Sequence, residues 1–173
     1  GIEKKTIFLN DTDRNDFIDR MATVAQDGAM DIYAWVVMPN HFHLLCKTKN
    51  RPLSSSMRKI LTGYAVNFNK RHRRHGHLFQ NRYKSIVCQE DLYLTELVRY
   101  IHLNALRAGL VDNLKDLNRY PWSGHSALVG RVKRKWQDCD YVLSFFGDGH
   151  HGRQNYLNYV RKAVDQGHRP ELV

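Results

Sequence analysis

This chain has few cysteines and prolines, a modest number of glycines and no long apolar run. The three cysteines are far apart and form no C-x-x-C pair: Cys46, Cys88 and Cys139. This usage argues against a disulfide framework and a structural zinc site, and it favours a reducing cytoplasm. The longest apolar run covers residues 32–38, whereas a membrane-spanning helix needs about 18 apolar residues. The sequence also shows no secretory signal.

The rest of the composition is that of a basic globular domain. The 173 residues are 42% hydrophobic and 11% aromatic, which excludes disorder as the dominant state and suits one domain or a domain with a small appendage. With 27 Lys and Arg against 17 Asp and Glu, the formal net charge is +10. A polyanion is the expected partner of such a chain, and nucleic acid is the commonest one.

Hydrophobic periodicity and turn signals predict an α-β-β-α-β-α order. The predicted elements are, in sequence, a helix over 12–26, strands over 31–38 and 41–47, a helix over 54–74, a strand over 85–89 and a helix over 91–108. This is a ferredoxin-like βαββαβ pattern with its first strand missing and one helix added. We therefore expect an α+β fold: a ferredoxin-like (RRM-like palm) antiparallel sheet with helices on one face, whose leading strand is missing from this chain.

The pattern weakens after Gly109. Short helices are predicted there over 123–129, 140–146 and 152–165. We expect a main domain over residues 1–129, followed over 130–173 by a basic linker and a helical C-terminal appendage.

Two histidines on the second predicted strand are the sharpest local feature. Residues i and i+2 of a strand point to the same face, so His41 and His43 project together and Phe42 lies on the opposite face. Two convergent imidazoles are half of a divalent-metal site. The simpler alternative is a pair of surface histidines in a chain that has ten.

The last long predicted helix carries a tyrosine and an asparagine one turn apart. Tyr100 and Asn104 are separated by four residues and share one helical face. Such a pair could provide a nucleophilic phenol beside a third metal ligand. His102 lies about 200° around the helix from Tyr100, so it serves a different face. The alternative is that Tyr100 packs at the edge of the core with its hydroxyl hydrogen-bonded.

Residues 70–84 form a basic segment with six Lys or Arg residues and no carboxylate. Cationic side chains neutralise phosphates and interleaved aromatic rings stack on unpaired bases, so the segment favours single-stranded or hairpin nucleic acid. The alternative is a solvated helix end whose cations interact with the helix dipole. The predicted DNA-binding residues are Arg71, Arg73, Arg74, Phe79, Arg82, Tyr83 and Lys84.

Three ordered motifs together resemble a known family. They are Met38-Pro-Asn-His-Phe-His-Leu-Leu45, Gly76-His-Leu-Phe-Gln-Asn-Arg-Tyr-Lys-Ser85 and Arg99-Tyr-Ile-His-Leu-Asn-Ala-Leu-Arg-Ala-Gly109. In these motifs the chain resembles the small single-tyrosine transposases of the HUH superfamily, and most of all the REP-associated tyrosine transposases. The resemblance extends from about Ile7 to Ser126, and more loosely to the end of the chain, and it implies that residues 1–129 form an HUH single-strand DNA transposase domain. Ala105-Leu106 replaces the Pro-Val that usually follows the asparagine, a change that removes no functional group.

The resemblance implies a metal site and a reaction. In that family a His-hydrophobic-His pair binds one Mg²⁺ or Mn²⁺, a helical tyrosine is the nucleophile, and a polar residue one turn later completes the metal site. By motif, this implies His41, His43 and Asn104 as metal ligands and Tyr100 as the catalytic residue. Family members cut single-stranded DNA beside imperfect palindromes, some as dimers and others as monomers. The implied function is cleavage and rejoining of single-stranded or hairpin DNA through a 5′-phosphotyrosine, in the cytoplasm at the nucleoid, with a homodimer as one implied assembly.

Two alternatives keep the fold but change the chemistry. In the first, the chain is a non-catalytic nucleic-acid-binding module, such as a repressor or an RNA binder. In the second, it is a metal nuclease that uses water rather than Tyr100 as the nucleophile and so forms no protein–DNA adduct. A replication or mobilisation nickase would share the tyrosine chemistry, but the small size of the chain and the motif context argue against it.

Overall fold

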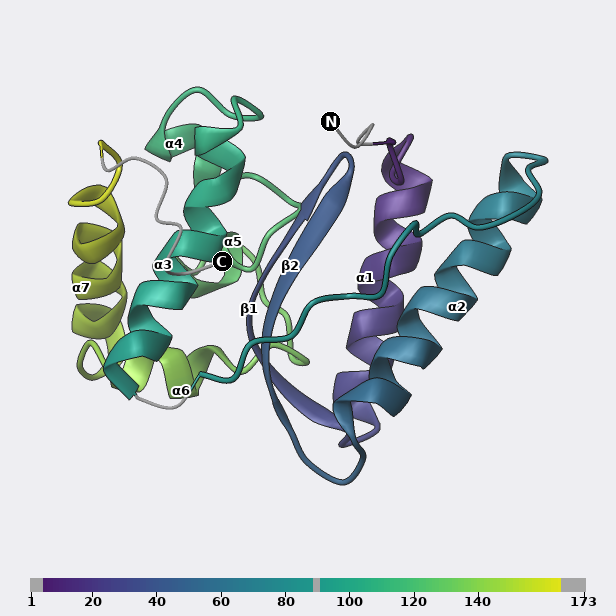
Figure 1. Ribbon diagram of the computed structural model, residues 1–173. Helices are drawn as coiled ribbons and strands as arrows, with labels where there is room; N and C mark the ends of the chain where they lie inside the picture. The colour runs from purple at the N-terminus through teal and green to yellow at the C-terminus, as the bar shows by residue number, and fades with distance from the viewer. Residues whose placement is uncertain (1–4, 89–90, 166–173) are drawn as a thin grey trace.

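A β-hairpin lies at the centre of the fold, and helices cover both of its faces (Figure 1). The computed structural model describes residues 5–88 and 91–165, with the side chains of residues 91 and 92 left out. Strands β1 (Met30–Met38) and β2 (His41–Thr48) pair in antiparallel fashion. Met38 faces His41 across the Pro39-Asn40 turn, so the predicted hairpin is confirmed.

Two long helices pack against one face of the hairpin. They are α1 (Asp11–Gln26) and α2 (Leu53–Arg71), both predicted from periodicity. Asn10 caps α1 by accepting a hydrogen bond from a backbone N–H of the first turn. The core of this face is largely aromatic and includes Phe8, Phe17, Trp35, Tyr64 and Phe68. Helix α2 ends three residues earlier than predicted, because Arg73 adopts a left-handed backbone conformation with φ of 52°.

The opposite face of the hairpin packs against α3 (Asp91–Arg107). The predicted helix is confirmed, and Gly109, with φ of 73°, follows its end. Four short helices follow: α4 (Leu114–Leu117), α5 (His125–Leu128), α6 (Cys139–Ser144) and α7 (Gly149–Arg161). Tyr156 and Val160 of α7 and Val142 of α6 belong to the same buried cluster as Leu103 of α3. The C-terminal helices therefore share a core with α3.

The α+β class with an antiparallel sheet is confirmed, and two details differ from the expectation. Helices cover both faces of the hairpin rather than one. Residues 82–88 contain no strand, and Ile86 and Val87 are 64% and 79% exposed; Gln89 of the predicted strand lies outside the described residues. A strand needs a neighbour to satisfy its backbone groups, and no third strand is present in the described part of the chain.

The two strands differ in how their outer edges are covered. Along the outer edge of β1, backbone hydrogen bonds run from Val37 N to Trp122 O (2.8 Å), from Gly124 N to Trp35 O (2.9 Å) and from Asp138 N to Ile32 O (2.8 Å). Strand β1 is accordingly buried at nearly every position, whereas β2 is only half-buried. Within residues 5–88 and 91–165, no helix is long and apolar enough to cross a membrane.

Candidate active site

The hairpin presents its two histidines toward α3. His41 and His43 pair with Met38 and Val36, which belong to the core shared with α3. The centroids of the two imidazole rings are 5.1 Å apart. Phe42 points to the opposite face, where its ring centroid lies 4.7 Å from that of Phe17. The predicted same-face arrangement of the two imidazoles is therefore confirmed.

Helix α3 brings Tyr100 to this pair of histidines. The centroid of the Tyr100 ring lies 6.5 Å from that of His43, and the two rings meet edge to face. Tyr100 is 5% exposed and therefore buried. Its neighbours include the His43 imidazole as well as apolar side chains. Asn104 follows one turn later on α3 and is half-buried. Its Nδ2 atom is buried and has no hydrogen-bond partner among the described residues.

The electrostatics of the site favour neutral histidine and a protonated phenol. Burial, with a smaller contribution from the neighbouring His41, lowers the pKa of His43 to about 4. Burial raises the pKa of the Tyr100 phenol, and the positive charge of Arg107 acts in the opposite direction. The guanidinium carbon of Arg107 lies 5.6 Å from the centroid of the Tyr100 ring. His43 is therefore in the form that binds metals, and Tyr100 must lose a proton before it can act as a nucleophile.

Two imidazoles from one strand are donors that suit a divalent cation, and the amide of Asn104 on α3 is the candidate third donor. No group of three His, Cys, Asp or Glu side chains suited to a metal occurs in the part of the chain that the structure describes, so a third protein ligand here would be another type of side chain, such as the amide of Asn104. The oxygen and nitrogen of an amide exchange places on rotation by 180°. Such a rotation would put the Asn104 oxygen where the buried atom without a partner now lies.

Two residues near the site were not identified from the sequence. Asn40 contacts His41 through Oδ1 and Nδ1, 2.6 Å apart, and this contact fixes the orientation of the imidazole. Arg107 lies beside Tyr100. Both have a local signal: Asn40 is the turn residue before His41, and Arg107 follows Tyr100 by seven residues, two turns along the same helical face.

His102 faces away from Tyr100, as its position around the helix predicts. It is fully buried, and its Nδ1 lies 3.0 Å from the hydroxyl of Tyr156 on α7. The same hydroxyl lies 2.8 Å from Nδ1 of His125. Helix α3 therefore carries Tyr100 on one side and a buried polar contact to the C-terminal helices on the other.

The predicted DNA-binding residues occupy different environments. Arg73, Arg82 and Lys84 are exposed. Arg71 instead forms ion pairs with Asp13 (2.8 Å) and Asp16 (3.3 Å) of α1, which ties its guanidinium to the protein.

The remaining members of the predicted set contact other side chains of the fold. The guanidinium carbon of Arg74 lies 5.6 Å from the centroid of the Phe68 ring. The rings of Phe79 and Tyr83 are partly buried against the core of the α1–α2 face. Exposed cations and partly covered rings thus lie along one continuous segment.

Comparison with known proteins gives two matches. Residues 2–104 match the family model described as "Transposase IS200 like". A solved structure described as a REP-associated tyrosine transposase bound to a REP hairpin aligns with a TM-score of 0.57 at 22% identity, over 84% of this chain and 82% of that one. At this identity the structural match shows the fold. No curated protein matches the chain. Because the family model spans more than half of the sequence, this protein belongs to the IS200-like transposases, a family of DNA-processing enzymes.

Proposed function

We propose that this protein cleaves and rejoins single-stranded DNA at hairpin or palindromic sites, with Tyr100 as the nucleophile. The observation that carries the proposal is the approach of Tyr100 on α3 to the imidazole pair on β2, with ring centroids of Tyr100 and His43 6.5 Å apart. Nothing in the local sequence forces these two elements together. Their proximity is a property of the packed fold.

Each residue near the site has a distinct role in the proposal. His41, His43 and Asn104 would hold one Mg²⁺ or Mn²⁺, and neutral nitrogen and amide ligands suit Mn²⁺ at least as well as Mg²⁺. When bound, the cation would neutralise charge on the scissile phosphate. Asn40 orients the His41 ring. Burial keeps His43 uncharged and able to bind a metal.

The proposed reaction exchanges one phosphodiester for another. The hydroxyl oxygen of Tyr100 bonds to the phosphorus while the bond from phosphorus to the 3′ oxygen breaks. The tyrosine loses its proton, the departing 3′ oxygen gains one, and the 5′ end stays attached to Tyr100. Attack by a 3′-hydroxyl reverses these steps, so rejoining requires no ATP. The positive charge of Arg107 reduces the free energy needed to form the Tyr100 phenolate.

The proposed substrate is hairpin DNA with an unpaired flank. The exposed cations Arg73, Arg82 and Lys84 would bind phosphates of the DNA that flanks the cleaved bond. The solved relative is described as bound to a REP hairpin, which supports a hairpin as the ligand here. The proposal places the enzyme in the cytoplasm at the nucleoid, where such DNA occurs, and includes a homodimer as one working assembly.

A covalent-adduct assay tests the proposed chemistry. With a labelled hairpin oligonucleotide and Mn²⁺, the wild-type protein should form an adduct that survives a denaturing gel. Tyr100→Phe should bind the same DNA but form no adduct. Tyr159→Phe is the matched control, because Tyr159 lies on α7 with its ring 3.9 Å from the guanidinium carbon of Arg99. It should form the adduct as the wild type does.

The other outcomes identify the alternatives. Cleavage by Tyr100→Phe, with a free 5′-phosphate, would show that water is the nucleophile. Binding without cleavage in any metal would show a non-catalytic binding module. For the metal site, His41→Ala and His43→Ala should each weaken Mn²⁺ binding in a calorimetric titration of the protein without DNA. Unchanged Mn²⁺ affinity in both variants would contradict the proposed ligands.

A further inference from the structure

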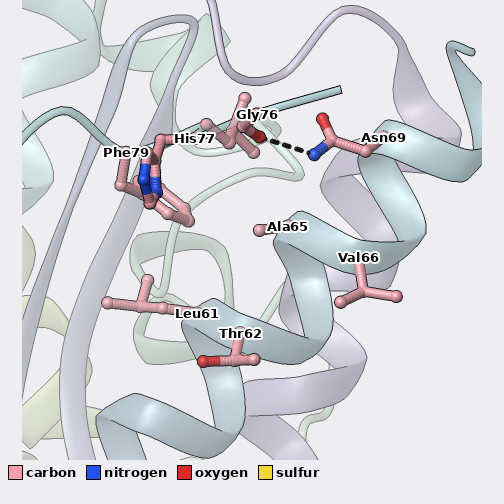
Figure 2. Close-up of a pocket in the computed structure, with 9 residues that line it drawn as sticks. Leu61, Thr62, Ala65, Val66, Asn69, Gly76, His77 and Phe79 are labelled. Carbon is pink, nitrogen blue, oxygen red and sulfur yellow. Dashed lines mark hydrogen bonds between the residues drawn. The ribbon is translucent and has the colours of Figure 1, made fainter. Parts of the chain in front are cut away.

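Helix α2, which lies on the face of the hairpin opposite α3 (Figure 1), carries an open groove (Figure 2). The groove has a volume of about 380 Å³ and lies between α2 and the segment that follows it. Its lining consists of Leu61, Thr62, Ala65, Val66 and Asn69 of α2 and of residues 76–79. Figure 2 shows the rings of His77 and Phe79 on one side and the Leu61, Ala65 and Val66 side chains along the helix.

The groove combines an apolar surface with two flat rings. Val66 is 61% exposed, although α2 could hold a polar residue there at no cost to the core. A single exposed valine is ordinary, but this one adjoins Leu61, Ala65 and the ring of Phe79. The arrangement offers π-faces for stacking and apolar side chains for the opposite face of a flat ligand.

The segment that closes the groove is held in place by a specific contact. Asn69 Nδ2 donates a hydrogen bond to the backbone oxygen of Gly76, 2.9 Å away. Gly76 has φ of 87°, a conformation that glycine adopts without strain. Leu78 is 3% exposed and anchors the segment in the core of the α1–α2 face. The aromatic side of the groove is therefore formed before a ligand arrives.

The charge around the groove identifies the class of ligand. Residues 32–89 contain eleven Lys and Arg and no Asp or Glu. Lys70 and Arg73, both exposed, continue the chain directly from the groove-lining end of α2. A second copy of the protein would place the same excess of positive charge against it. A polyanion with flat apolar groups matches the surface better.

We propose that this groove holds an unpaired base of the DNA substrate. The proposal rests on the proposed function, since it assumes that single-stranded DNA is the ligand. The base stacks on the rings of His77 and Phe79 against Ala65 and Val66, and the adjacent phosphates contact Lys70 and Arg73. The groove then selects DNA with an unpaired nucleotide over a fully paired duplex, independently of the chemistry at Tyr100.

Equilibrium binding without divalent metal tests the groove separately from cleavage. The probes are a DNA hairpin with an oligothymidine flank and the same hairpin with abasic residues in that flank. His77→Ala should weaken binding of the thymidine probe about tenfold, the loss expected for one stacked base. It should leave binding of the abasic probe unchanged. His77→Phe should bind the thymidine probe like the wild type, because it keeps the ring without any charge.

A second variant fills the groove from the other side. Val66→Gln should weaken binding of the thymidine probe but not of the abasic one. Ser55→Gln is its control, since Ser55 is exposed on the same helix outside the groove. Equal losses on both probes would overturn the proposal, as would an altered oligomeric state of Val66→Gln, which would assign the groove to a second copy. Failure of the Tyr100 chemistry would leave these binding differences in place, so the two proposals fail separately.

Discussion

The two faces of the hairpin are stabilised by different kinds of buried polar contact. On the α3 face, His102, His125 and Tyr156 form a network in which every group is neutral. On the α1–α2 face, the buried carboxylate of Asp13 forms an ion pair with Arg71 and contacts the imidazole of His72. The first network holds the helix that carries Tyr100, and the second holds the end of α2, where the basic segment begins.

The hydrogen bonds of the neutral network have a consistent direction. Trp35 N–H donates to His102 Nε2 (3.4 Å), so His102 Nδ1–H must donate to the Tyr156 hydroxyl (3.0 Å). The Tyr156 hydroxyl then donates to His125 Nδ1 (2.8 Å), and His125 Nε2–H donates to Asn118 Oδ1 (2.8 Å). This assignment satisfies each atom only when both imidazoles are uncharged. The network therefore joins β1, α3, α5 and α7, and it loses hydrogen bonds when either imidazole takes up a proton.

The cluster around Asp13, in contrast, depends on an ionised side chain. The Asp13 carboxylate accepts hydrogen bonds from Leu9 N–H (2.8 Å), Arg71 Nε (2.8 Å) and His72 Nε2 (2.9 Å). Burial alone would raise the pKa of Asp13, but the hydrogen bonds from His72, Leu9 and Arg71 outweigh it and hold the pKa below 3.8. The two faces therefore differ in their response to pH. As the pH falls, His125 of the neutral network is protonated before the Asp13 carboxylate is.

Acidification should cause the largest loss in the free energy of unfolding. Burial lowers the pKa of His125 from 6.5 to about 4, and burial together with His125 and Arg134 lowers that of His102 in the same direction. Because the unfolded chain takes up protons first, stability is full above pH 6.5 and falls as the pH approaches 4. The shift of His125 alone corresponds to a loss of roughly 3 kcal/mol. Urea unfolding between pH 7.5 and pH 4 measures it.

Hydrogen exchange tests the order of the two faces. Between pH 6 and pH 4, amides of α3 and α7 should lose protection before those of α1 and α2, because Asp13 stays ionised in this range. Protection that falls equally on both faces, or a free energy of unfolding that stays constant over the range, would contradict the assignment of neutral imidazoles.

Removal of one hydroxyl should break the neutral network at constant pH. Tyr156→Phe keeps the ring but leaves a donor and an acceptor of the two histidines buried without a partner. We expect a loss of about 2 to 3 kcal/mol, because each unsatisfied buried polar group costs about 1 to 3 kcal/mol and two are left here; the loss appears as a lower melting temperature. Tyr159→Phe on the same helix is the control and should change it little, since the Tyr159 ring makes the contact to Arg99. A Tyr156→Phe protein as stable as the control would show that the network does not contribute to the free energy of unfolding.

The elements of the fold were predictable where their signals are local. The hairpin and the three long helices follow from periods of 2 and 3.6, and the same period of 2 puts His41 and His43 on one face. The prediction of a strand over 85–89 was wrong for residues 85–88. A strand forms only beside another strand, and periodicity does not reveal whether one is present.

Contacts between distant residues were not predictable in the same way. Arg71, a predicted DNA-binding residue, forms an ion pair with Asp13, 58 residues earlier in the chain, which no local pattern indicates. The neutral network brings together His102 and Tyr156, which are 54 residues apart. Single-sequence patterns contain no information on such pairs. The approach of Tyr100 to His43 is also a contact between distant residues. The resemblance to a family implied it, whereas the spacing of residues in the sequence did not.

Loss of the charge on Asp13 should have an intermediate effect. Asp13→Asn keeps the shape of the side chain but removes the ion pair to Arg71 and the negative charge that His72 contacts; both partners are partly exposed. We expect a loss of about 2 kcal/mol, less than for a pair with both partners buried. The variant should also bind DNA more weakly, because the start of the basic segment loses its attachment to α1. Asp11→Asn is the control, since Asp11 is 76% exposed in its pair with Arg14.

The smallest effect should come from an ion pair on the surface of the same α1–α2 face. Lys59 Nζ lies 3.1 Å from Asp27 Oδ2, and these side chains are 51% and 40% exposed. Lys59→Gln should lower stability by less than about 0.5 kcal/mol, because solvent screens exposed charges and the long side chain gains freedom. Thermal unfolding beside Asp13→Asn measures the difference. A loss as large as that of Asp13→Asn would mean that charge pairing in general, rather than burial of the Asp13 carboxylate, joins α1 to α2.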